Sequence, residues 1–502
     1  MAFTDYDRHD GLGLAELVRT KQVHPRELVD EAIARIERAN PRINAVIHRM
    51  YDSARATADA VDVGSGAPFV GVPFLAKDLM STWAGEPQAS GSRLTAGWRP
   101  DHDSELVTRW RAAGVICVGK TSTPEFGIVP VTEPVAFGPT RNPWDLDRTP
   151  GGSSGGSGAA VAAGFVPLAS GGDGGGSIRI PSSCCGLFGL KPTRGRTPGG
   201  PDRGESWQGC AIEHVLTRTV RDSAAMLDAT HGIDPGAPYA APAPTGRFLD
   251  QVGAAPGKLR IAFTRRALLP AEVDPVCAAA AEDAARLLTE LGHEVVEDHP
   301  SFDAEQLSLD FLTMLVGEVA ADVAQWEQTL GRRARVGDLE KETAVLVRMG
   351  HAVPAVEFAL AARRLRLLAR QLAPFFATYD VLLTPTLAQL PLSIGALAPK
   401  AGEAALLRVA QRLPIGGVLH KLGALDQMAG RAWAFTPFTA PWNVTGQPAC
   451  NLPLTWHDRP GLPSLPVGVQ LVGRFGDEAT LLRLASQCEA ARPWRERRPP
   501  AR

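Results

Sequence analysis

Two glycine-dense runs that contain serine constrain the fold of this chain more than any other feature. They read TPGGSSGGSGAAVAAG from Thr149 and ASGGDGGGSIRIPSSCCGLFGLKPTRGR from Ala169. A run such as GGSSGGSG is also typical of a flexible linker. Here, however, the apolar segments AAVAAGFVPLA and RIPSSCCGLFGL follow at once, and glycines before a buried segment more often provide a backbone conformation. We therefore predict two tight turns inside the folded core.

The rest of the chain alternates short apolar strands with helical segments. The expected strands are VPFLAK (72–77), VICVGK (115–120), KLRIAFT (258–264), HEVVE (293–297), DVLLTPT (380–386) and VGVQLVG (467–473). The expected helices cover Pro25–Ala39, the later part of Asn44–Ala60, Pro275–Leu291 and most of 303–372, by their helical spacing of apolar residues. Such alternation predicts an α/β fold whose sheet is covered on both faces.

No clean linker divides the 502 residues. We therefore expect a single domain over 1–502, with the core motifs within 65–200 and a variable, mostly helical, substrate-facing region at about 300–432. Within that region, 390–432 is low in strand character and bounded by prolines. This stretch is expected to form a lid or a substrate-facing insertion.

Composition and charge exclude several classes of function. The net charge is −2, so neither nucleic acid nor an anionic membrane is expected as a partner. No apolar run is long enough to span a membrane, and the start MAFTDYDRHDGLG lacks the regions of a signal peptide. Seven scattered cysteines do not resemble a disulfide framework, which favours a cytoplasmic location. Without H-E-x-x-H or paired C-x-x-C spacings, we expect no metal site and no cofactor.

Two short motifs match on paper but fail in context. Residues 114–121, GVICVGKT, fit the phosphate-binding loop expression, yet the residues between the glycines are β-forming and Pro124 follows soon after. Residues 152–156, GSSGG, fit G-x-S-x-G around Ser154. A nucleophile elbow must follow a buried strand, and the preceding RNPWDLDRTP is polar. We predict neither a nucleotide site nor an α/β-hydrolase elbow.

The serines and one lysine favour a different chemistry. A serine is a poor nucleophile until a base takes its proton, and lysine serves as that base only when burial keeps it neutral. Lys77 closes the apolar run VPFLAK. The glycine amides before Ser177 can converge on one point, as an oxyanion hole or a phosphate nest requires. Because no lysine or arginine stands where a phosphate would need it, a serine–lysine hydrolase is the hypothesis.

Longer motifs carry a resemblance to a known family. They are GVPFLAKD around Lys77, FGPTRNPWD at 137–145, PGGSSGGSGAAVAAG at 150–164, GGDGGGSIRIPSSCCGLFGLKPTRGR at 171–196, and the tail that starts APWNVTGQPACNLPL at 440–473. The chain resembles the amidase signature family over nearly its whole length, most weakly at about 300–432. The resemblance implies an α/β/α sandwich, with a mixed, twisted central sheet and helices on both faces.

The resemblance also implies a Ser–cis-Ser–Lys triad. Ser177 would be the nucleophile, Ser153 the bridging serine next to a cis peptide bond, and Lys77 the base. Ser154 is expected to hydrogen-bond to the triad, while Asp173 and Arg179 are expected to form a structural ion pair. The oxyanion would be received by four backbone amides, those of Gly174, Gly175, Gly176 and Ser177.

The substrate class is less constrained. The second turn reads G-D-G-G-G-S where many relatives read T-D-x-G-G-S, which leaves room for a wider acyl pocket. The run after it resembles the branch of the family that acts on nylon oligomers, and 123–138 and 300–432 are expected to build the pocket. We expect a small-molecule substrate: a linear or cyclic amide first, and an aryl carbamate or ester as the alternative. A homodimer is one option for assembly.

Two readings from other classes remain open at this point. One is a nucleotide-binding protein that uses GVICVGKT. The other is a catalytically silent scaffold or amidotransferase-type subunit. The glutaminase subunit of tRNA amidotransferases is disfavoured, because its D-E-F-x-M-G-S-S-T-E stretch is replaced here by TPEFGIVPVTE at 123–133.

Overall fold

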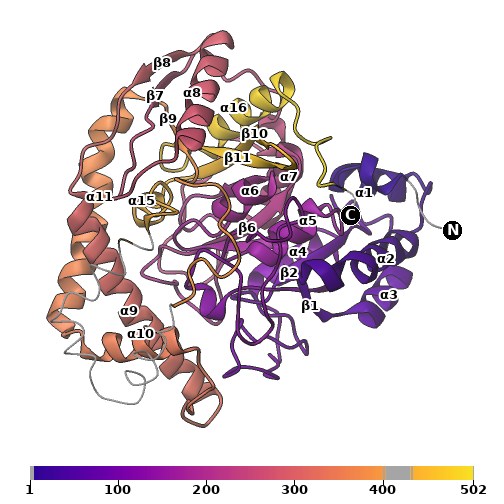
Figure 1. Ribbon diagram of the computed structural model, residues 1–502. Helices are drawn as coiled ribbons and strands as arrows, with labels where there is room; N and C mark the ends of the chain where they lie inside the picture. The colour runs from indigo at the N-terminus through magenta and orange to yellow at the C-terminus, as the bar shows by residue number, and fades with distance from the viewer. Residues whose placement is uncertain (1–4, 400–401, 403–429, 431–432, 501–502) are drawn as a thin grey trace.

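A mixed sheet of eleven strands runs through the computed structural model, which describes residues 5–399, 402, 430 and 433–500 (Figure 1). The strand order is β1-β3-β2-β4-β6-β5-β10-β11-β9-β7-β8. The strands are β1 Val46–Arg49, β2 Pro73–Lys77, β3 Ile116–Thr121, β4 Leu168–Asp173, β5 Phe188–Lys191, β6 Ile212–Thr217, β7 Arg260–Phe263, β8 Glu294–Glu297, β9 Val381–Pro385, β10 Ala449–Arg459 and β11 Leu462–Gly473.

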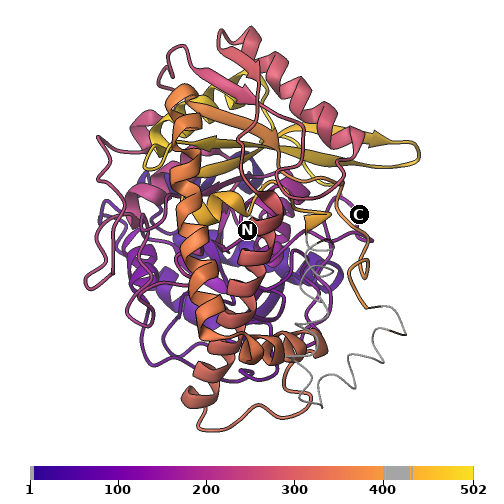
Figure 2. The same cartoon turned by 90° about the vertical axis from the view of Figure 1, so that its left-hand side faces the viewer.

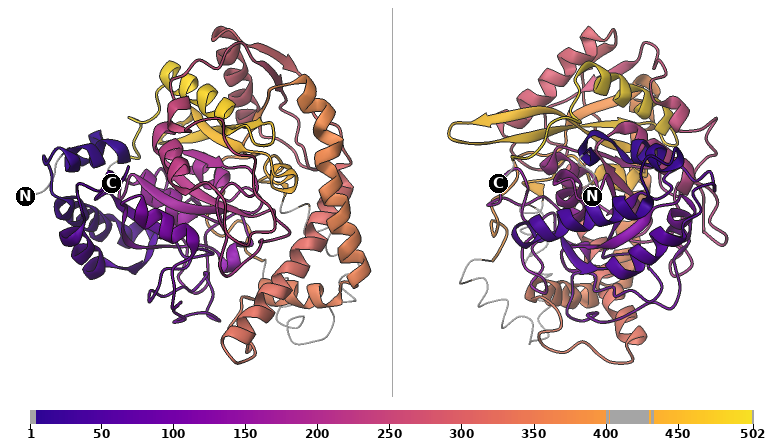
Figure 3. Two further views of the ribbon diagram at one scale, coloured as in Figure 1. Left: turned by 180° about the vertical axis from the view of Figure 1, so that it is seen from behind. Right: turned by 90° about the vertical axis from the view of Figure 1, so that its right-hand side faces the viewer.

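Helices cover this sheet, and the two longest, α9 and α11, lie far from the amino-terminal ones (Figure 1). The α-helices are α1 Gly11–Arg19, α2 Pro25–Ile43, α3 Tyr51–Ala60, α4 Glu105–Ala112, α5 Gly155–Ala162, α6 Arg179–Cys185, α7 Val220–Thr230, α8 Pro275–Glu290, α9 Ala304–Thr329, α10 Lys341–Ala352, α11 Ala355–Thr378, α15 Pro441–Thr445 and α16 Glu478–Ala491. Short 3₁₀ turns are η1 Tyr6–Arg8, η2 Glu125–Gly127 and η3 Leu249–Gln251. Helices α9 and α11 run side by side, and the β10–β11 hairpin projects from the body (Figure 2). The first and last described segments, η1 and the stretch after α16, lie near α1 and opposite α9–α11 (Figure 3).

Alternation along the strands explains why both faces of the sheet are covered. In β9, Val381 and Leu383 are buried with α7, α8 and α16, whereas Leu382 is buried with α9, α10, α11 and α15. Successive strand residues point to opposite faces, so a strand that begins with three consecutive apolar residues has to be packed on both. The α/β/α arrangement predicted from the sequence is confirmed.

The candidate site lies at the carboxyl ends of three neighbouring parallel strands. Strand β2 pairs with β3 on one side and with β4 on the other, both in parallel register. Their carboxyl ends are Lys77, Thr121 and Asp173, all buried. Chemistry in sheets of this kind gathers beyond the carboxyl ends of the strands. Both glycine-rich turns lie at this edge. The first is hydrogen-bonded to Lys77 through Ser153, and the second follows β4 directly.

Most of the expected elements agree with the structure to within a few residues. All six expected strands form, and GVICVGKT is largely strand β3, so it does not have the loop that a phosphate site needs. The helix expected at Pro25–Ala39 continues to Ile43 through Pro41, and left-handed Asn44 (φ 54°) ends it. Strands β1, β4, β5, β6 and β10 are not among the six expected strands. The stretch 390–432, expected as a lid, lies for the most part outside the described residues.

Among the described helices, none is by itself long and apolar enough to cross a membrane. The pair α10 and α11 meets that test of length and composition only when taken together, across a bend of 102°.

Candidate active site

Lys77, at the end of β2, is 2% exposed and points toward the serine-containing turns. Its Nζ donates a hydrogen bond of 2.7 Å to Ser153 Oγ and a longer one of 3.4 Å to the carbonyl oxygen of Gly172. Its backbone amide donates to Ser170 Oγ at 2.8 Å. The lysine is therefore held at both ends, and its ammonium nitrogen is directed at a serine hydroxyl.

Burial decides the charge of this lysine. Desolvation lowers the pKa of Lys77 to about 7, although the negative charges of Glu213 and Asp173 act in the opposite direction. Near neutral pH a substantial share of the molecules thus carries a neutral amine with a free lone pair. A buried lysine in this state can accept a proton, as an exposed lysine at the same pH cannot.

The first glycine-rich turn presents Ser153 and Ser154. The peptide bond between Gly152 and Ser153 is cis. The Ser154 amide donates to the carbonyl oxygen of Ser177 at 3.2 Å, and Ser154 Oγ donates to the carbonyl oxygen of Gly172 at 3.2 Å. Ser154 therefore links the two turns and shares the carbonyl oxygen of Gly172 with Lys77.

Close packing explains the glycines after these serines. A Cβ atom on Gly156 would lie 2.5 Å from both the backbone nitrogen and the backbone oxygen of Ser122. No side chain fits in that space, so helix α5 can approach the end of β3 only with glycine there. This run is a packed turn and helix start, as the sequence predicted.

The second turn, between β4 and α6, carries Ser177. Gly176 has φ 134°, a backbone conformation that side chains rarely adopt, and a Cβ there would collide with Thr439. Its amide donates to Asp173 Oδ1 at 2.7 Å. The sequence assigned this amide to the oxyanion hole; that assignment is corrected, because the carboxylate already uses the N–H.

The other three amides of the predicted set remain available. Within the described residues, no hydrogen-bond acceptor is paired with the backbone N–H of Gly174, Gly175 or Ser177. Unpaired N–H groups beside a partly exposed serine are what a developing oxyanion requires.

Asp173 and Arg179 form a fully buried ion pair beneath this turn. Arg179 Nη2 lies 2.9 Å from Asp173 Oδ1, and both side chains are 0% exposed. Burial alone would raise the pKa of Asp173, but the charge and hydrogen bonds of Arg179, with a hydrogen bond from Asn443, hold it well below its usual range. Arg179 also donates to Asn443 and Gln470. The expected structural pairing of the two residues is observed.

Lys77, Ser153 and Ser177 line one small cavity of about 40 Å³. Aromatic and apolar side chains close it, namely Leu79, Met80, Phe126, Trp207, Ala211 and Trp326. The structure thus brings together the three residues that the sequence singled out, although Lys77 and Ser153 are 76 residues apart in the chain and Ser153 and Ser177 are 24 apart. We call this cavity the catalytic pocket. In the part of the chain that the structure describes, no cluster of three or more His, Cys, Asp or Glu is arranged to hold a metal ion.

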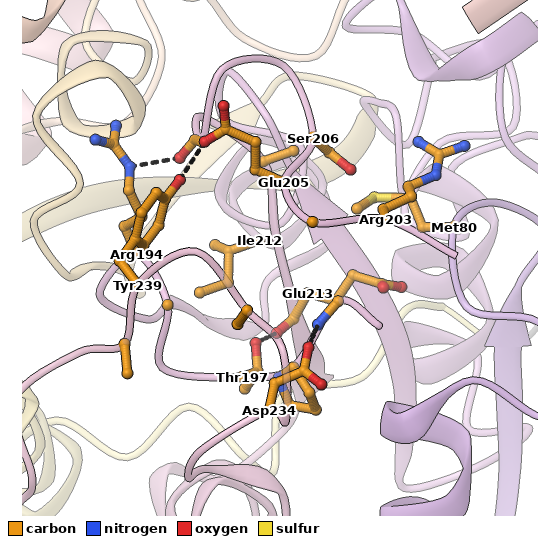
Figure 4. Close-up of a pocket in the computed structure, with 18 residues that line it drawn as sticks. Met80, Arg194, Thr197, Arg203, Glu205, Ser206, Ile212, Glu213, Asp234 and Tyr239 are labelled. Carbon is orange, nitrogen blue, oxygen red and sulfur yellow. Dashed lines mark hydrogen bonds between the residues drawn. The ribbon is translucent and has the colours of Figure 1, made fainter. Parts of the chain in front are cut away.

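A neighbouring cavity of about 70 Å³ shares Met80, Arg203, Ser206 and Ala211 with the catalytic pocket. Figure 4 shows Met80 and Arg203 on one side of it, with Arg194 and Tyr239 on the other. The loop before β6 forms much of its wall. The catalytic pocket therefore has a second cavity directly beside it.

Several residues around the site were missed from the sequence. Glu213 on β6 lies opposite Gly172 in the strand register and raises the pKa of Lys77. Asn443 donates to the carbonyl oxygen of Asp173 at 2.8 Å, and its motif APWNVTG was noticed without a role for this side chain. Phe126 and Trp207 adopt left-handed backbone conformations (φ 49° and 51°), for which the sequence holds no signal.

Comparison with known proteins agrees with this geometry. The family model described as Amidase matches residues 27–482. The chain is 39% identical over 501 residues to the 6-aminohexanoate-cyclic-dimer hydrolase of Pseudomonas sp. (strain NK87), covering 98% of this chain and 96% of the relative. It is also similar to the solved structure of 6-aminohexanoate cyclic dimer hydrolase complexed with substrate, with a TM-score of 0.87, 37% identity and 99% of each chain covered. A bacterial aryl acylamidase structure gives a TM-score of 0.82 at 27% identity, covering 97% and 96% of the two chains.

Fold, site and comparisons define the class: a hydrolase that acts on amide carbon–nitrogen bonds. The chain belongs to the amidase family. The family resemblance found in the sequence is confirmed, and the silent-scaffold and nucleotide-binding alternatives are set aside.

Proposed function

We propose that the protein cleaves amides through an acyl-enzyme intermediate, with Ser177 as nucleophile, Ser153 as bridging serine and Lys77 as base. Neutral Lys77 takes the proton of Ser153 as Ser153 takes that of Ser177, and Ser177 Oγ attacks the carbonyl carbon. The relay then runs in reverse, and the leaving nitrogen departs with a proton. Water attacks the acyl ester by the same route and restores Ser177.

The contact between Lys77 Nζ and Ser153 Oγ, at 2.7 Å, carries this proposal. It joins a side chain that can be a neutral base to a hydroxyl, inside a cavity that Ser177 also lines. A lysine held only for structure would be expected to pair with a carboxylate. Here Glu213 and Asp173 influence it from a distance, while its short hydrogen bond goes to serine.

The oxyanion would be received by the backbone amides of Gly174, Gly175 and Ser177. Removing one such donor typically costs about 10²–10³ in kcat. Thr439 Oγ1 donates to the carbonyl oxygen of Gly175 at 2.6 Å, and the N–H of the same peptide group, that of Gly176, donates to Asp173 Oδ1 at 2.7 Å. This peptide group, in the middle of the turn, is therefore held at both ends.

The substrates proposed are linear or cyclic amides, such as nylon-type oligomers or aryl amides. Support comes from the printed name of the relative, 6-aminohexanoate-cyclic-dimer hydrolase, and from the aryl acylamidase. Phe126, Trp207 and Trp326 offer aromatic surface in the catalytic pocket. The same surface and triad would accept aryl carbamates and esters, the second candidate chemistry. The single-domain boundary 1–502 and a homodimer stay predictions.

The test is intact-protein mass spectrometry after treatment with a fluorophosphonate. We expect one adduct on the native chain, none on Ser177→Ala, and slower labelling of Lys77→Ala. Ser65→Ala, which changes an exposed serine, serves as the control and should label like the native chain. Labelling that persists in Ser177→Ala would show that another residue is the nucleophile and would overturn the proposed triad.

A further inference from the structure

Three cavities meet beside the catalytic residues. The catalytic pocket has a volume of about 40 Å³, and the cavity of Figure 4 has about 70 Å³. A third cavity, of about 170 Å³, is lined by Trp98, Leu106 and Trp326 among others, and we call it the large cavity. An amide carries a group on each side of its bond, and the catalytic pocket is the smallest of the three spaces. Longer groups therefore need room outside it.

A small set of residues separates these cavities. Met80, Arg203 and Ser206 line all three. A residue that borders three cavities at once is part of the partition between them. Arg203 lies 3.8 Å from Asp322, and the carbonyl oxygen of Ser206 accepts hydrogen bonds from two later amides of its own loop. Met80 is the apolar member of the set, with a flexible, unbranched side chain.

The sulfur of Met80 lies over a glycine of the catalytic pocket. A Cβ atom on Gly172 would be 3.1 Å from Met80 Sδ and 3.6 Å from Glu213 Cγ. Gly172 lines the catalytic pocket, whereas Glu213 lines both neighbouring cavities. In Figure 4, Met80 lies beside Arg203 at this boundary. The Met80 thioether therefore lies where the catalytic pocket meets its two neighbours.

The backbone of Met80 is fixed in an unusual conformation. Its φ is 70°, in the left-handed region that residues with a side chain rarely adopt. The chain is anchored on both sides of it: Asp78 accepts a hydrogen bond of 3.1 Å from the amide of Ala89, and Ser81 Oγ donates to Glu213 Oε2 at 2.8 Å. Backbone strain of this kind persists where the surroundings enforce it, and it is concentrated at ligand sites. The start of the side chain is thus held in place, while its rotatable bonds let the thioether move.

Apolar surface continues from the catalytic pocket into the large cavity. Trp326 lines both, and its ring meets that of Trp98 edge to face, with centroids 4.9 Å apart. The cavity of Figure 4 is instead bordered by Arg194, Glu205 and Asp234, which line neither of the others. An alkyl or aryl group loses less by entering the large cavity, because charged groups resist the loss of water.

From this we infer that Met80 is a specificity-determining residue, which limits the length of the substrate group beyond the cleaved amide. With a short group, the substrate stays within the catalytic pocket and the thioether remains in place. A longer alkyl or aryl group reaches the large cavity only when the thioether turns aside, and this displacement lowers kcat/KM. The inference rests on the proposed function and names the residue that selects among amides by size.

Two series of amides of increasing length test this role. The first consists of p-nitroanilides from acetyl to octanoyl. The second consists of N-alkyl acetamides from methyl to octyl, with the released amine measured by chromatography. The readout is the ratio of kcat/KM for the longest and the shortest probe of a series. Taken within one variant, this ratio does not depend on the amount of folded protein.

The variants change the size of one side chain. Met80→Ala keeps a Cβ, and with it the cost of a left-handed backbone, but removes the thioether. We expect it to raise the ratio about tenfold or more in one of the two series, since methylene groups then gain a place in a pocket. Met80→Leu conserves the volume and should keep the native ratio. Leu462→Ala removes an exposed apolar side chain on β11 and should also keep it.

The possible failures can be told apart. A native ratio in Met80→Ala, in both series, would overturn the role of Met80 and leave the triad standing. The same holds if the ratio in Met80→Leu rises as far as in Met80→Ala, because side-chain size would then not be decisive. No hydrolysis of any probe, together with no fluorophosphonate adduct, would overturn the proposed function and the role of Met80 with it.

Discussion

At the scale of single residues, the protonation of Lys77 controls the proposed reaction. Burial lowers the pKa of Lys77 to about 7, so the neutral base is the minority form below that pH and the majority form above it. We expect kcat/KM for an amide to fall about tenfold per pH unit as pH drops below about 7, and to level off above it. A profile over pH 5.5 to 10 measures this. A rate that is flat across the range, or a limb near the pKa of an ordinary lysine, would contradict the assignment.

Glu213 shifts the pH below which the rate is expected to fall, because it acts on the pKa of Lys77. Its carboxylate, hydrogen-bonded to Ser81 Oγ at 2.8 Å, raises the pKa of Lys77 and so favours the protonated form. Asp173 acts on Lys77 in the same direction. Burial raises the pKa of Glu213 itself to about 7, although Ser81, Lys77 and Arg203 act in the opposite direction, so near neutral pH part of the molecules carry its charge. In Glu213→Gln the lysine loses that charge, so the acid limb of the pH–rate profile should move to lower pH.

Glu489→Gln is the matched control for this shift. Burial raises the pKa of Glu489 to about 7, as it does for Glu213, but Glu489 bonds to the amide of Val220 and does not act on Lys77. Its profile should keep the native limb. An unmoved limb in Glu213→Gln would mean that other groups set the base.

Residue identities at the site were predictable, but their environments were not. Lys77, Ser153 and Ser177 lie in long motifs, so a single sequence is enough to select them. That the Gly176 amide belongs to Asp173 depends on the path of the turn after β4. The charge on Glu213 matters because β6 pairs with β4, and β6 was not recognised.

At the scale of elements, the turn after β4 depends on a buried guanidinium. Arg179 binds Asp173 from within α6 and reaches Asn443 on α15 and Gln470 on β11. Arg179→Met leaves the Asp173 carboxylate buried without its partner, so the free energy of unfolding should fall by about 3–5 kcal/mol. Urea denaturation followed by circular dichroism measures the change.

Arg8→Met removes the exposed Arg8–Asp5 pair, whose side chains are 79% and 50% exposed. Exposed pairs contribute about 0–1 kcal/mol, so this control should unfold almost as the native chain does. Equal losses in the two variants would show that the Asp173–Arg179 pair does not hold the turn.

Among the elements, strands with a continuous apolar run and helices with a clear apolar stripe were predictable. Strand β6 was not, since IEHVLT places a glutamate and a histidine among its apolar residues. Both are buried in the structure, His214 against Ser223 and Glu213 against Ser81. Buried polar residues of this kind are recognisable only when their partners are known.

At the scale of the whole molecule, the sheet is packed on both of its faces. Leu382 and Leu383 are neighbours in β9, both 0% exposed, yet they pack into different layers. Leu382→Ala and Leu383→Ala should each lower the free energy of unfolding by about 2–5 kcal/mol, because each leaves a cavity on its own face. Leu462→Ala, at a position 57% exposed, should change it by less than about 0.5 kcal/mol. Denaturant titration gives all three, and a loss confined to one of the two β9 variants would show that only one face is packed.

The sequence by itself determined the local conformations and the chemistry on offer. These are properties of short segments: the spacing of glycines, the apolar runs, and the motifs around Lys77, Ser153 and Ser177. Such properties can be identified in the sequence without knowing which distant segments they contact. Only the tertiary structure decided which amides stay free for an oxyanion and how far burial lowers the pKa of Lys77. Each of these depends on which distant segments exclude water from a group and which partners they supply, and that is settled only when β4, β6, α9 and α15 come together.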